Sequence, residues 1–367
     1  MEHMDTPTPT NMLAVGLMSG TSLDGLDVVL VSFQLSGTSS SPSPTFRIVN
    51  FESRKYPPTL QNQLERAHLL SLEQFFVLDR AWAEFAAEVV KQVCGKHLDD
   101  VAVIASHGHT VLHSPPTYTV QLGSGAVLHA RLERPVVCDF RSLDVALGGQ
   151  GAPLVPVADA HLFAQYGATL NLGGFANVRD AATGASWDIA PCNTLLNRLA
   201  QREGLDYDDR GALAKQGVIN QSLLDALQAI PHHKAPPSRK SSLSREWAEQ
   251  HVWQLFDNAA ASSTTRDLLA TSVAYIADVV SRDCPPNTTV LVTGGGAYND
   301  FLLSRMSEHG RARSVEFVVP EDNAVVEGKE AVCFAYLGVL RMRGEPNADI
   351  KATGACRASI GGALWGV

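Results

Sequence analysis

Residues 16–27 read GLMSGTSLDGLD and lie between two apolar runs, residues 12–15 and residues 28–31. Apolar runs of this length on both sides predict two neighbouring buried strands, and the polar stretch is then the turn that joins them. No Gly-Lys-Ser/Thr sequence follows, so the stretch is not a P-loop. Its composition fits an ordinary polar hairpin turn as well as an anion-binding loop, so the choice depends on the rest of the chain.

The anion-binding interpretation rests on three glycines, three hydroxyls and two carboxylates within this stretch. Glycine lets backbone N–H groups approach an anion closely, and the hydroxyls of Ser19, Thr21 and Ser22 add donors. Asp24 and Asp27 can hold a metal ion or a water molecule beside phosphates. A phosphate-binding loop with metal ligands is therefore the functional alternative.

Length and composition bound the class of protein. The chain has 367 residues, of which 45% are apolar and 18% charged, and these values predict a globular protein of two domains. The net charge of −9 argues against a nucleic-acid partner or an anionic membrane surface, and no apolar run is long enough to span a membrane. The six cysteines form no C-x-x-C pair, and no secretion signal is recognisable, so we expect reduced thiols in a cytoplasmic protein.

The first part of the chain continues with alternating strand and helix patterns. Residues 45–53 predict a third strand, and residues 72–98 carry an apolar stripe at helical spacing. Residues 101–105 predict a short buried strand that ends just before His107 and Gly108. Because α/β sheets bind ligands beyond the carboxyl ends of their strands, this position favours a site.

Two sets of polar residues near this strand allow more than one interpretation. His107, His109 and His113 suggest a metal cluster, but no acidic or Cys ligand lies nearby in the sequence, so hydrogen-bonding or core histidines are favoured. Arg141 and Asp144 fit either ligand contacts or an ordinary ion pair, and the ion pair is slightly favoured.

The same pattern of elements restarts at residue 168. A strand, the turn Gly173-Gly174 and two more strands precede a helix over residues 194–202. This order repeats the plan of residues 12–53, and a repeat at this scale indicates duplicated domains that face one another across a cleft. The expected N-terminal domain covers residues 12–130, the second domain covers residues 131–344, and residues 345–367 pack back on the first.

Two later stretches are candidates for contacts with phosphate. Residues 294–296 are three glycines between a predicted strand and a helix from about Asn299, where free N–H groups and the helix dipole favour a phosphate or an adenosine. Tight turns also need glycine, so this motif is weak alone. Residues 231–244 are rich in Lys, Ser and Pro, which fits a solvated basic loop or, as the functional alternative, a lid over phosphate.

In their joint order and spacing, these motifs resemble those of the anhydro-N-acetylmuramic acid kinases, with the fungal levoglucosan kinases as relatives. The resemblance runs from about residue 13 to residue 355. Its motifs are residues 16–27, 106–108, 139–141, 148–156 and 171–174, then Asp188 with Pro191 and Asn193, and finally residues 294–296, 329–331 and 353–355.

This resemblance implies a fold and a reaction. The family belongs to the sugar kinase/Hsp70/actin superfamily, so it implies an α/β fold of two ribonuclease-H-like domains with ATP and Mg²⁺ in the cleft between them. The implied kinase opens the 1,6-anhydro ring of anhydro-N-acetylmuramic acid with water and phosphorylates O6, giving N-acetylmuramic acid 6-phosphate in cell-wall sugar recycling. It also implies a homodimer. A kinase for another anhydro sugar such as levoglucosan, and a non-catalytic sugar or nucleotide sensor, stay open as alternatives.

The resemblance also implies roles for individual residues. Asp188 matches the catalytic base, which takes a proton from the attacking water. Asp24 and Asp27 match positions beside Mg²⁺, in contact directly or through water. The implied sugar contacts are His107, Gly108, Arg141, Asn193 and Glu330. The implied nucleotide contacts are Gly20, Thr21, Ser22, Leu23, Asp24, Gly25, Leu26, Asp27, Gly173, Gly174, Gly294, Gly295 and Gly296.

The chain departs from the family's usual pattern at a few positions. Family members usually read Asp-Thr-Gly-Pro-Gly-Asn where residues 188–193 read DIAPCN. Ala190 and Cys192 thus replace glycines where the backbone normally bends close to ligand, and this motivates the sensor alternative. His109 replaces the usual Gln. The retained base and Glu330 favour an active kinase.

Overall fold

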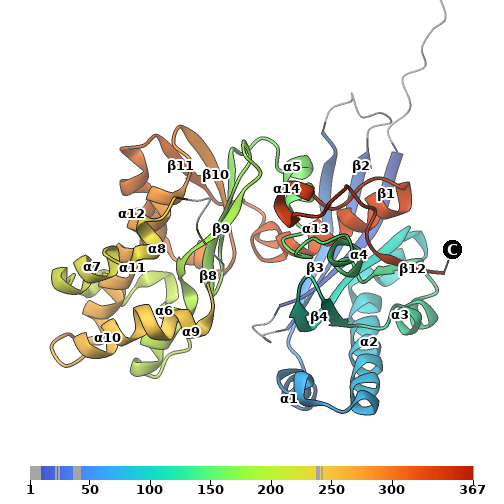
Figure 1. Cartoon of the computed structure of the whole chain (residues 1–367), viewed down its shortest axis with the longest axis horizontal. Coiled ribbons are helices and arrows are strands. Elements are labelled where there is room, and N and C mark those ends of the chain that lie inside the picture. Colours follow the sequence, from blue (N-terminus) through green and yellow to red (C-terminus); the bar gives the residue numbers. More distant parts are fainter. Residues whose placement is uncertain are drawn as a thin grey trace, which may run out of the picture. The chain divides into compact units, whose positions relative to one another are not determined.

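The computed structural model describes residues 10–20, 23, 25–35, 43–236, 240 and 243–366. It divides into two compact units, unit 1 (Met1–Ala164 and Gly328–Val367) and unit 2 (Gln165–Glu327), each with one mixed sheet and flanking helices (Figure 1). The α/β class expected from the sequence is confirmed. Among the described residues, no helix combines the length and the apolar character needed to cross a membrane.

The sheet of unit 1 has the strand order β12-β6-β4-β1-β2-β3, and β5 pairs with β4 at one end. The first three strands are antiparallel neighbours, whereas β4 runs parallel to β1 and β6 runs parallel to β4. The C-terminal strand β12 adds to the outer edge of β6. The strands are β1 (Thr10–Ser19), β2 (Leu26–Leu35), β3 (Thr45–Arg54), β4 (Val103–Ser114), β5 (Tyr118–Leu122), β6 (Val136–Cys138) and β12 (Ala363–Trp365).

Both faces of this sheet are covered by helices, which explains why its strands are near-continuous apolar runs. Val15 and Leu17 of β1 pack with the long helix α2 (Leu72–Cys94) in one hydrophobic cluster. Gly16 points to the other face, against helix α13 (Asn323–Arg343), where a Cβ would overlap the carbonyl oxygen of Ala331. Glycine at position 16 is therefore required for the close approach of helix and strand.

Unit 2 repeats the same plan in a five-stranded sheet of order β11-β10-β7-β8-β9. Three antiparallel strands come first, β10 is parallel to β7, and β11 is parallel to β10. The duplication predicted from the sequence, and with it the pair of ribonuclease-H-like domains, is confirmed. The strands are β7 (Ala168–Leu172), β8 (Phe175–Asp180), β9 (Ser186–Pro191), β10 (Thr288–Thr293) and β11 (Val315–Val318).

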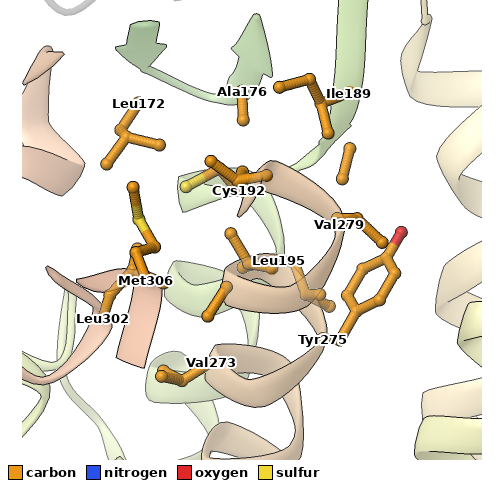
Figure 2. Close-up of a cluster of buried hydrophobic side chains, with 14 of the residues drawn as sticks. Leu172, Ala176, Ile189, Cys192, Leu195, Val273, Tyr275, Val279, Leu302 and Met306 are labelled. Atoms are coloured by element: carbon orange, nitrogen blue, oxygen red, sulfur yellow. The ribbon is translucent and has the colours of Figure 1, made fainter. Parts of the chain in front are cut away.

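The core of unit 2 forms between its sheet and three helices, α6 (Asn193–Ala200), α11 (Thr265–Asp283) and α12 (Asp300–Arg311). In Figure 2, Cys192 and Leu195 lie among side chains from the sheet and from the other two helices. The remaining helices of unit 1 are α1 (Pro58–Glu65), α3 (Gly125–Leu132), α4 (Ser142–Ala146), α5 (Pro156–Leu162) and α14 (Ile350–Thr353). Those of unit 2 are α7 (Gln221–Gln228), α8 (Pro231–Lys234), α9 (Arg245–Ala248) and α10 (Gln254–Ala259).

The observed division differs from the boundaries at residues 130 and 344 that the sequence suggested. Residues 131–164 and 328–344 lie in unit 1 instead. The reason is pairing and packing, because β6 joins the first sheet beside β4 and the C-terminal part of α13 covers that sheet at Gly16. The pairing of β12 with β6 brings the C-terminal segment into the same unit.

One strand is longer than predicted. The expected strand over residues 101–105 continues as β4 to Ser114 and forms a hairpin with β5, an element that the sequence analysis did not predict. Gly108 adopts a φ of 73° within this strand, and a Cβ there would overlap the carbonyl oxygen of Leu122. His107 and Gly108 therefore lie inside a bent strand rather than beyond its end.

Candidate functional site

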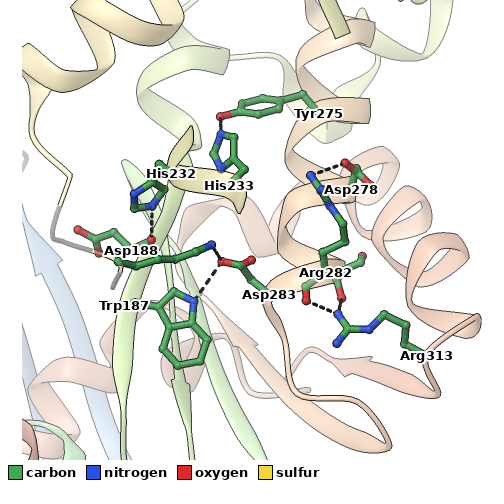
Figure 3. A network of polar contacts seen from close by, with 11 residues as sticks. Trp187, Asp188, His232, His233, Tyr275, Asp278, Arg282, Asp283 and Arg313 are labelled. Carbon is green, nitrogen blue, oxygen red and sulfur yellow. Dashed lines mark hydrogen bonds and ion pairs between the residues drawn. The ribbon is translucent and has the colours of Figure 1, made fainter. Parts of the chain in front are cut away.

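Asp188 lies near the end of β9 in unit 2 and is half-buried. Its Oδ2 accepts a hydrogen bond from the backbone N–H of Leu243 at 2.8 Å, and its carbonyl oxygen accepts one from Nε2 of His232 at 2.9 Å (Figure 3). Burial raises the pKa of Asp188, and the hydrogen bond from Leu243 and the His232 charge partly oppose this. The carboxylate is thus fixed in orientation, with its pKa moved toward the range that suits a general base.

Next to Asp188, the basic loop is anchored in the protein. Lys240 is 1% exposed and forms an ion pair with Asp283 of α11, which also accepts a hydrogen bond from Nε1 of Trp187 at 3.1 Å. Both sequence-based interpretations of this loop are therefore wrong for Lys240, which is neither solvated nor free to reach a phosphate. Arg239 lies outside the described residues.

The glycines predicted for nucleotide binding in unit 2 come together around Asn193. The carbonyl oxygens of Gly173 and Gly174 accept the backbone N–H groups of Asn193 at 3.1 Å and of Cys192 at 2.8 Å. The Asn193 side chain donates to the carbonyl oxygen of Leu172 at 2.9 Å. The turn Gly173-Gly174 between β7 and β8 thereby fixes the position of the N-terminus of α6.

Gly295 and Gly296 form one wall of a cavity of about 410 Å³, just before the start of α12. Gly294 precedes them with a φ of 83°, and a Cβ there would overlap the side chain of Asn171. Asn193 lines the same cavity, so the structure places this expected sugar contact beside the glycine loop. The other lining residues are Leu196, Asn197, Tyr207, Asp208, Asp209, Arg210, Tyr298 and Asn299.

In unit 1, the turn between β1 and β2 is described at Gly20, Leu23 and Gly25, and Leu26 and Asp27 open β2; Thr21, Ser22 and Asp24 lie outside the described residues. The carbonyl oxygen of Leu23 accepts a hydrogen bond from the Gln61 side chain at 2.9 Å, and a Cβ at Gly25 would overlap the carbonyl oxygen of Arg54. The Leu26 side chain is buried in the cluster that contains α2, so only its backbone remains for a ligand. Asp27 is half-buried and faces the opposite side of the sheet.

Ser19 has a structural partner rather than an exposed hydroxyl. It is 1% exposed and accepts a hydrogen bond from the Tyr56 hydroxyl at 2.6 Å, which in turn accepts one from Nε1 of Trp82 at 3.1 Å. The Ser19 hydroxyl also forms a hydrogen bond with Nδ1 of His109, 2.9 Å away. Burial lowers the pKa of His109, which keeps this ring neutral in the network. The suggestion that Ser19 donates to an anion is wrong.

His107 and Arg141 are bound to each other in unit 1. The Arg141 guanidinium donates through Nε to Nε2 of His107 at 3.1 Å, and Nδ1 of His107 donates to the carbonyl oxygen of Gly108 at 2.8 Å. Burial and the Arg141 charge lower the pKa of His107 to about 3, so the ring is neutral. Burial also lowers the pKa of Arg141, to about 10, and the Glu330 charge partly opposes this.

Arg141 and Asp144 bind the same residue instead of each other. Arg141 donates to the carbonyl oxygen of Gly151, whereas Oδ2 of Asp144 accepts the N–H of Gly151 at 2.7 Å and its Oδ1 accepts the Thr353 hydroxyl at 2.7 Å. The favoured ion-pair interpretation is therefore wrong. The two side chains fix the glycine-rich loop from both sides.

Three consecutive residues of α13 have three different roles. The Lys329 ammonium forms a buried ion pair with Asp159 at 2.7 Å, Ala331 contacts Gly16, and the Glu330 side chain is exposed. Although the carboxylate of Glu330 reaches solvent, the surrounding protein raises its pKa by desolvation, and the charges of Lys329 and Arg141 partly oppose this. Glu330 is thus a carboxylate on a rigid helix, held close to the Arg141 charge.

A second cavity, of about 310 Å³, lies in unit 1 beside His107 and Gly108. Its lining includes Asp79, whose Oδ1 accepts the N–H of Gly123 at 2.7 Å, and the exposed ring of Phe76. The sequence analysis missed this cavity because its lining comes from separate elements. It also missed Leu243 and His232 around Asp188, although the adjacent histidines after Pro231 were visible in the sequence.

The sequence profile of the anhydro-N-acetylmuramic acid kinase family matches residues 12–366. Relatives that carry this name include proteins from Synechococcus sp. (strain CC9902), 32% identical over 96% of this chain and 99% of its own length, and from Chromobacterium violaceum, 33% identical over 96% and 99%. The chain belongs to the anhydro-N-acetylmuramic acid kinase family. Membership makes it a phosphotransferase and confirms the resemblance seen in the sequence.

The similarity of this chain to solved structures is weaker than its similarity to the sequence relatives. The (R)-2-hydroxyglutaryl-CoA dehydratase component A of Acidaminococcus fermentans is 10% identical, with a TM-score of 0.45, over 89% of this chain and 97% of that chain. This overlap is too low to add to the family assignment.

The departures from the pattern of anhydro-N-acetylmuramic acid kinases are accommodated inside the protein. Ala190 and Cys192 are both 0% exposed and belong to the hydrophobic core of unit 2. His109 is bound to Ser19 in the buried network of unit 1. The side chains that replace the two glycines are therefore packed into the core.

Proposed function

We propose that the protein is an ATP-dependent kinase that opens the 1,6-anhydro ring of anhydro-N-acetylmuramic acid with water and transfers the γ-phosphoryl group to O6. In this reaction the water oxygen attacks the anomeric carbon while Asp188 takes a proton from it. The bond between the anomeric carbon and O6 breaks, and O6 then accepts the phosphoryl group. The products are N-acetylmuramic acid 6-phosphate and ADP.

The geometry of Asp188 is the observation that carries this proposal. A base for water must be ionised, accessible and held in one orientation. One oxygen of the Asp188 carboxylate is fixed by the N–H of Leu243, and the half-buried position raises its pKa. Within the described part of the chain, the second oxygen of the carboxylate has no hydrogen-bond donor, and we assign it to accept the proton.

Nucleotide binding is assigned to the cavity beside Gly295 and Gly296. Its volume of about 410 Å³ is within the range of small-molecule sites. The backbone of the glycine loop and the N-terminus of α12 offer N–H groups to phosphate, and the exposed ring of Tyr207 offers a surface for a base. We therefore assign Asn193 to this pocket, next to the turn Gly173-Gly174.

The turn of unit 1 is assigned to the phosphates and to Mg²⁺. Mg²⁺ is typically held by one or two carboxylates together with substrate phosphates, and the half-buried carboxylate of Asp27 at the start of β2 fits this requirement. Asp24 is the second candidate. When bound, the ion would neutralise charge on the phosphates.

Sugar recognition is assigned to His107, Gly108, Arg141 and Glu330. The neutral His107 ring is oriented by Arg141, and the exposed carboxylate of Glu330 can accept hydrogen bonds from sugar hydroxyls. A set of oriented donors and acceptors on rigid elements suits a polar substrate.

The sensor alternative has lost its motivation, because Ala190 and Cys192 are core residues. The choice between anhydro-N-acetylmuramic acid and levoglucosan remains for the assay. We further propose that the reaction takes place in the cytoplasm, which the six free cysteines support. The homodimer that the family implies stays a prediction, and light scattering in solution tests it.

The test is sugar-dependent ADP release by the wild type and by Asp188→Asn. We expect kcat to fall by about a thousandfold, since a positioned general base contributes roughly 10²–10⁴. Calorimetry should show unchanged binding of a non-hydrolysable ATP analogue. The matched control is Asp225→Asn on the exposed surface of α7, which should leave kcat unchanged.

Three other results of this assay would each change a different part of the proposal. Full turnover by Asp188→Asn would show that the assignment of the base is wrong. Faster turnover of levoglucosan than of anhydro-N-acetylmuramic acid would keep the reaction class and change the substrate. If the wild type binds the sugar without any ADP release, the protein is not a kinase for that sugar.

A further inference from the structure

The ion pair between Lys240 and Asp283 is buried to an unusual degree for charged groups. The two side chains are 1% and 12% exposed. Buried charges are costly unless they are paired and hydrogen-bonded, and Asp283 is both, because Trp187 donates to its Oδ2. A pair of this kind fixes a position in the fold more than it adds stability.

The position that it fixes lies close along the chain to Leu243, which binds the base. Leu243, whose N–H binds Oδ2 of Asp188, follows Lys240 by three residues. On the other side of Leu243, the Ser244 side chain caps helix α9 by accepting the N–H of Trp247 at 3.2 Å. Leu243 is thus held between two anchors.

Asp283 of α11, the partner of Lys240, also binds the strand that carries Asp188. Trp187 precedes Asp188 on β9, and its Nε1 binds the same carboxylate that binds Lys240 (Figure 3). Strand and loop are thereby tied to one residue of α11, Asp283. A change at Asp283 therefore acts on Asp188 from both the strand and the loop.

We propose that Lys240 and Asp283 are positioning residues for the base: their ion pair holds the N–H of Leu243 on the carboxylate of Asp188. This inference rests on the proposed role of Asp188. Neither residue touches the reacting atoms. They act by keeping one carboxylate oxygen occupied and the other oriented toward water.

Loss of this N–H donor has a consequence that can be measured. Among the described residues, the titratable side chain whose charge acts on Asp188 is His232 from α8, and the charges of Lys240 and Asp283 act in turn on His232. The hydrogen bond from Leu243 lowers the pKa of Asp188. Without it the pKa rises, so a larger share of the base is protonated at a given pH and the acid limb of the rate profile moves to higher pH.

The experiment measures kcat, KM for both substrates and the pH profile of Lys240→Met and Asp283→Asn. We expect kcat to fall on the order of tenfold to a hundredfold, as for a misplaced catalytic group, with KM for ATP unchanged and the acid limb shifted upward. The double variant should lose no more than the worse single variant, because both changes remove one interaction. Trp187→Phe, which removes one donor to Asp283, should have a smaller effect in the same direction.

The matched control is Asp278→Asn on the same helix. The substitution breaks the ion pair between Asp278 and Arg282. Asp278 lies five residues before Asp283, roughly one and a half helical turns away, so kcat and the pH profile should be unchanged. Circular dichroism and thermal unfolding establish that each variant is folded. If Lys240→Met does not fold, Asp283→Asn, which keeps the shape of the side chain, carries the test.

The outcomes separate this inference from the proposed function. If Asp188→Asn is inactive while folded Lys240→Met and Asp283→Asn keep the wild-type kcat and acid limb, the positioning role is wrong and the base assignment stands. If Asp188→Asn is fully active, the proposed function fails first. A lower kcat with an unshifted acid limb would also overturn the inference, because it would show an effect on general structure only.

Discussion

Units 1 and 2 share a strand order but hold their polar groups in different ways. In unit 1, His107, Arg141 and Asp144 are bound to each other or to the loop around Gly151, and their hydrogen bonds involve backbone and side-chain partners on several elements. In unit 2, the half-buried Asp188 carboxylate accepts, among the described residues, one hydrogen bond, from the backbone N–H of Leu243.

This difference agrees with the two tasks that we propose for these groups. Groups that recognise a substrate gain from being rigid and paired, since their partners are fixed before binding. A group that must take up a proton gains from incomplete pairing, since full pairing lowers its pKa and its reactivity. Unit 1 therefore resembles a prearranged binding surface, and unit 2 resembles a support for one reactive carboxylate.

The largest expected effect is a loss of stability on substitution of a glycine at the first strand of each sheet, Gly16 in unit 1 and Gly173 in unit 2. Gly16→Ala places a methyl group against the backbone of α13, so we expect a loss of about 3 kcal/mol or more in the free energy of unfolding. Gly173→Ala, in the turn between β7 and β8 of unit 2, has the flexible Asn171 side chain as its nearest neighbour at 3.2 Å and should cost less than about 1 kcal/mol. Urea unfolding measures both, and equal losses would show that the strand glycine and the turn glycine are under the same constraint.

An intermediate effect is expected when unit 1 loses a prearranged group. Arg141→Met removes charged hydrogen bonds to His107 and to the carbonyl oxygen of Gly151. Without these bonds the sugar contacts are no longer held in place, so KM for the sugar should rise roughly tenfold to a hundredfold while KM for ATP stays the same. Arg134→Met, which also loses a hydrogen bond to a carbonyl oxygen, is the control. A rise in both KM values would contradict the assignment of Arg141 to the sugar.

The smallest expected effect is the change in the stability of the protein when Asp188 itself is replaced. The pKa of Asp188 is higher in the folded state than in the unfolded state, so its contribution to stability is full below the unfolded pKa and is lost as the pH rises through the folded value. At pH 7, the free energy of unfolding of Asp188→Asn should therefore exceed that of the wild type by less than about 1 kcal/mol, and the variant should unfold at a slightly higher temperature. Near pH 3 this difference should vanish.

The corresponding control in unit 1 has the opposite sign. Asp144 accepts hydrogen bonds from Gly151 and Thr353, so Asp144→Asn should destabilise the protein at pH 7. Thermal scans across this pH range check both variants. Destabilisation by both would remove the contrast between a reactive and a structural carboxylate.

The repeated fold was predictable because local patterns determine it. The bounds of β7 are those that the apolar run predicted, and β3 differs by one residue, since turn residues delimit both strands. The hairpin of β4 and β5 was not predictable in the same way. Its bend depends on Gly108 lying against Leu122, which is a contact between strands.

The site was predictable as a set of residues and less so as a set of contacts. Asp188 stands out in the sequence through the family's motif, but its partner Leu243 lies 55 residues away, and Ser19 and His109 are 90 residues apart. Tertiary packing, which no local pattern records, chooses such partners. For the same reason Lys240 was expected in a solvated loop and is buried.

The order of the units along the chain has a consequence for synthesis. Unit 2 is one continuous segment, whereas unit 1 needs α13 and β12 from the end of the chain to complete its sheet and cover it. Because a ribosome delivers the chain from its N-terminus, all residues of unit 2 are present before unit 1 can be completed. A product truncated shortly after residue 327 would therefore hold a complete unit 2 beside an unfinished sheet with an exposed face, a form that cellular quality control is expected to remove.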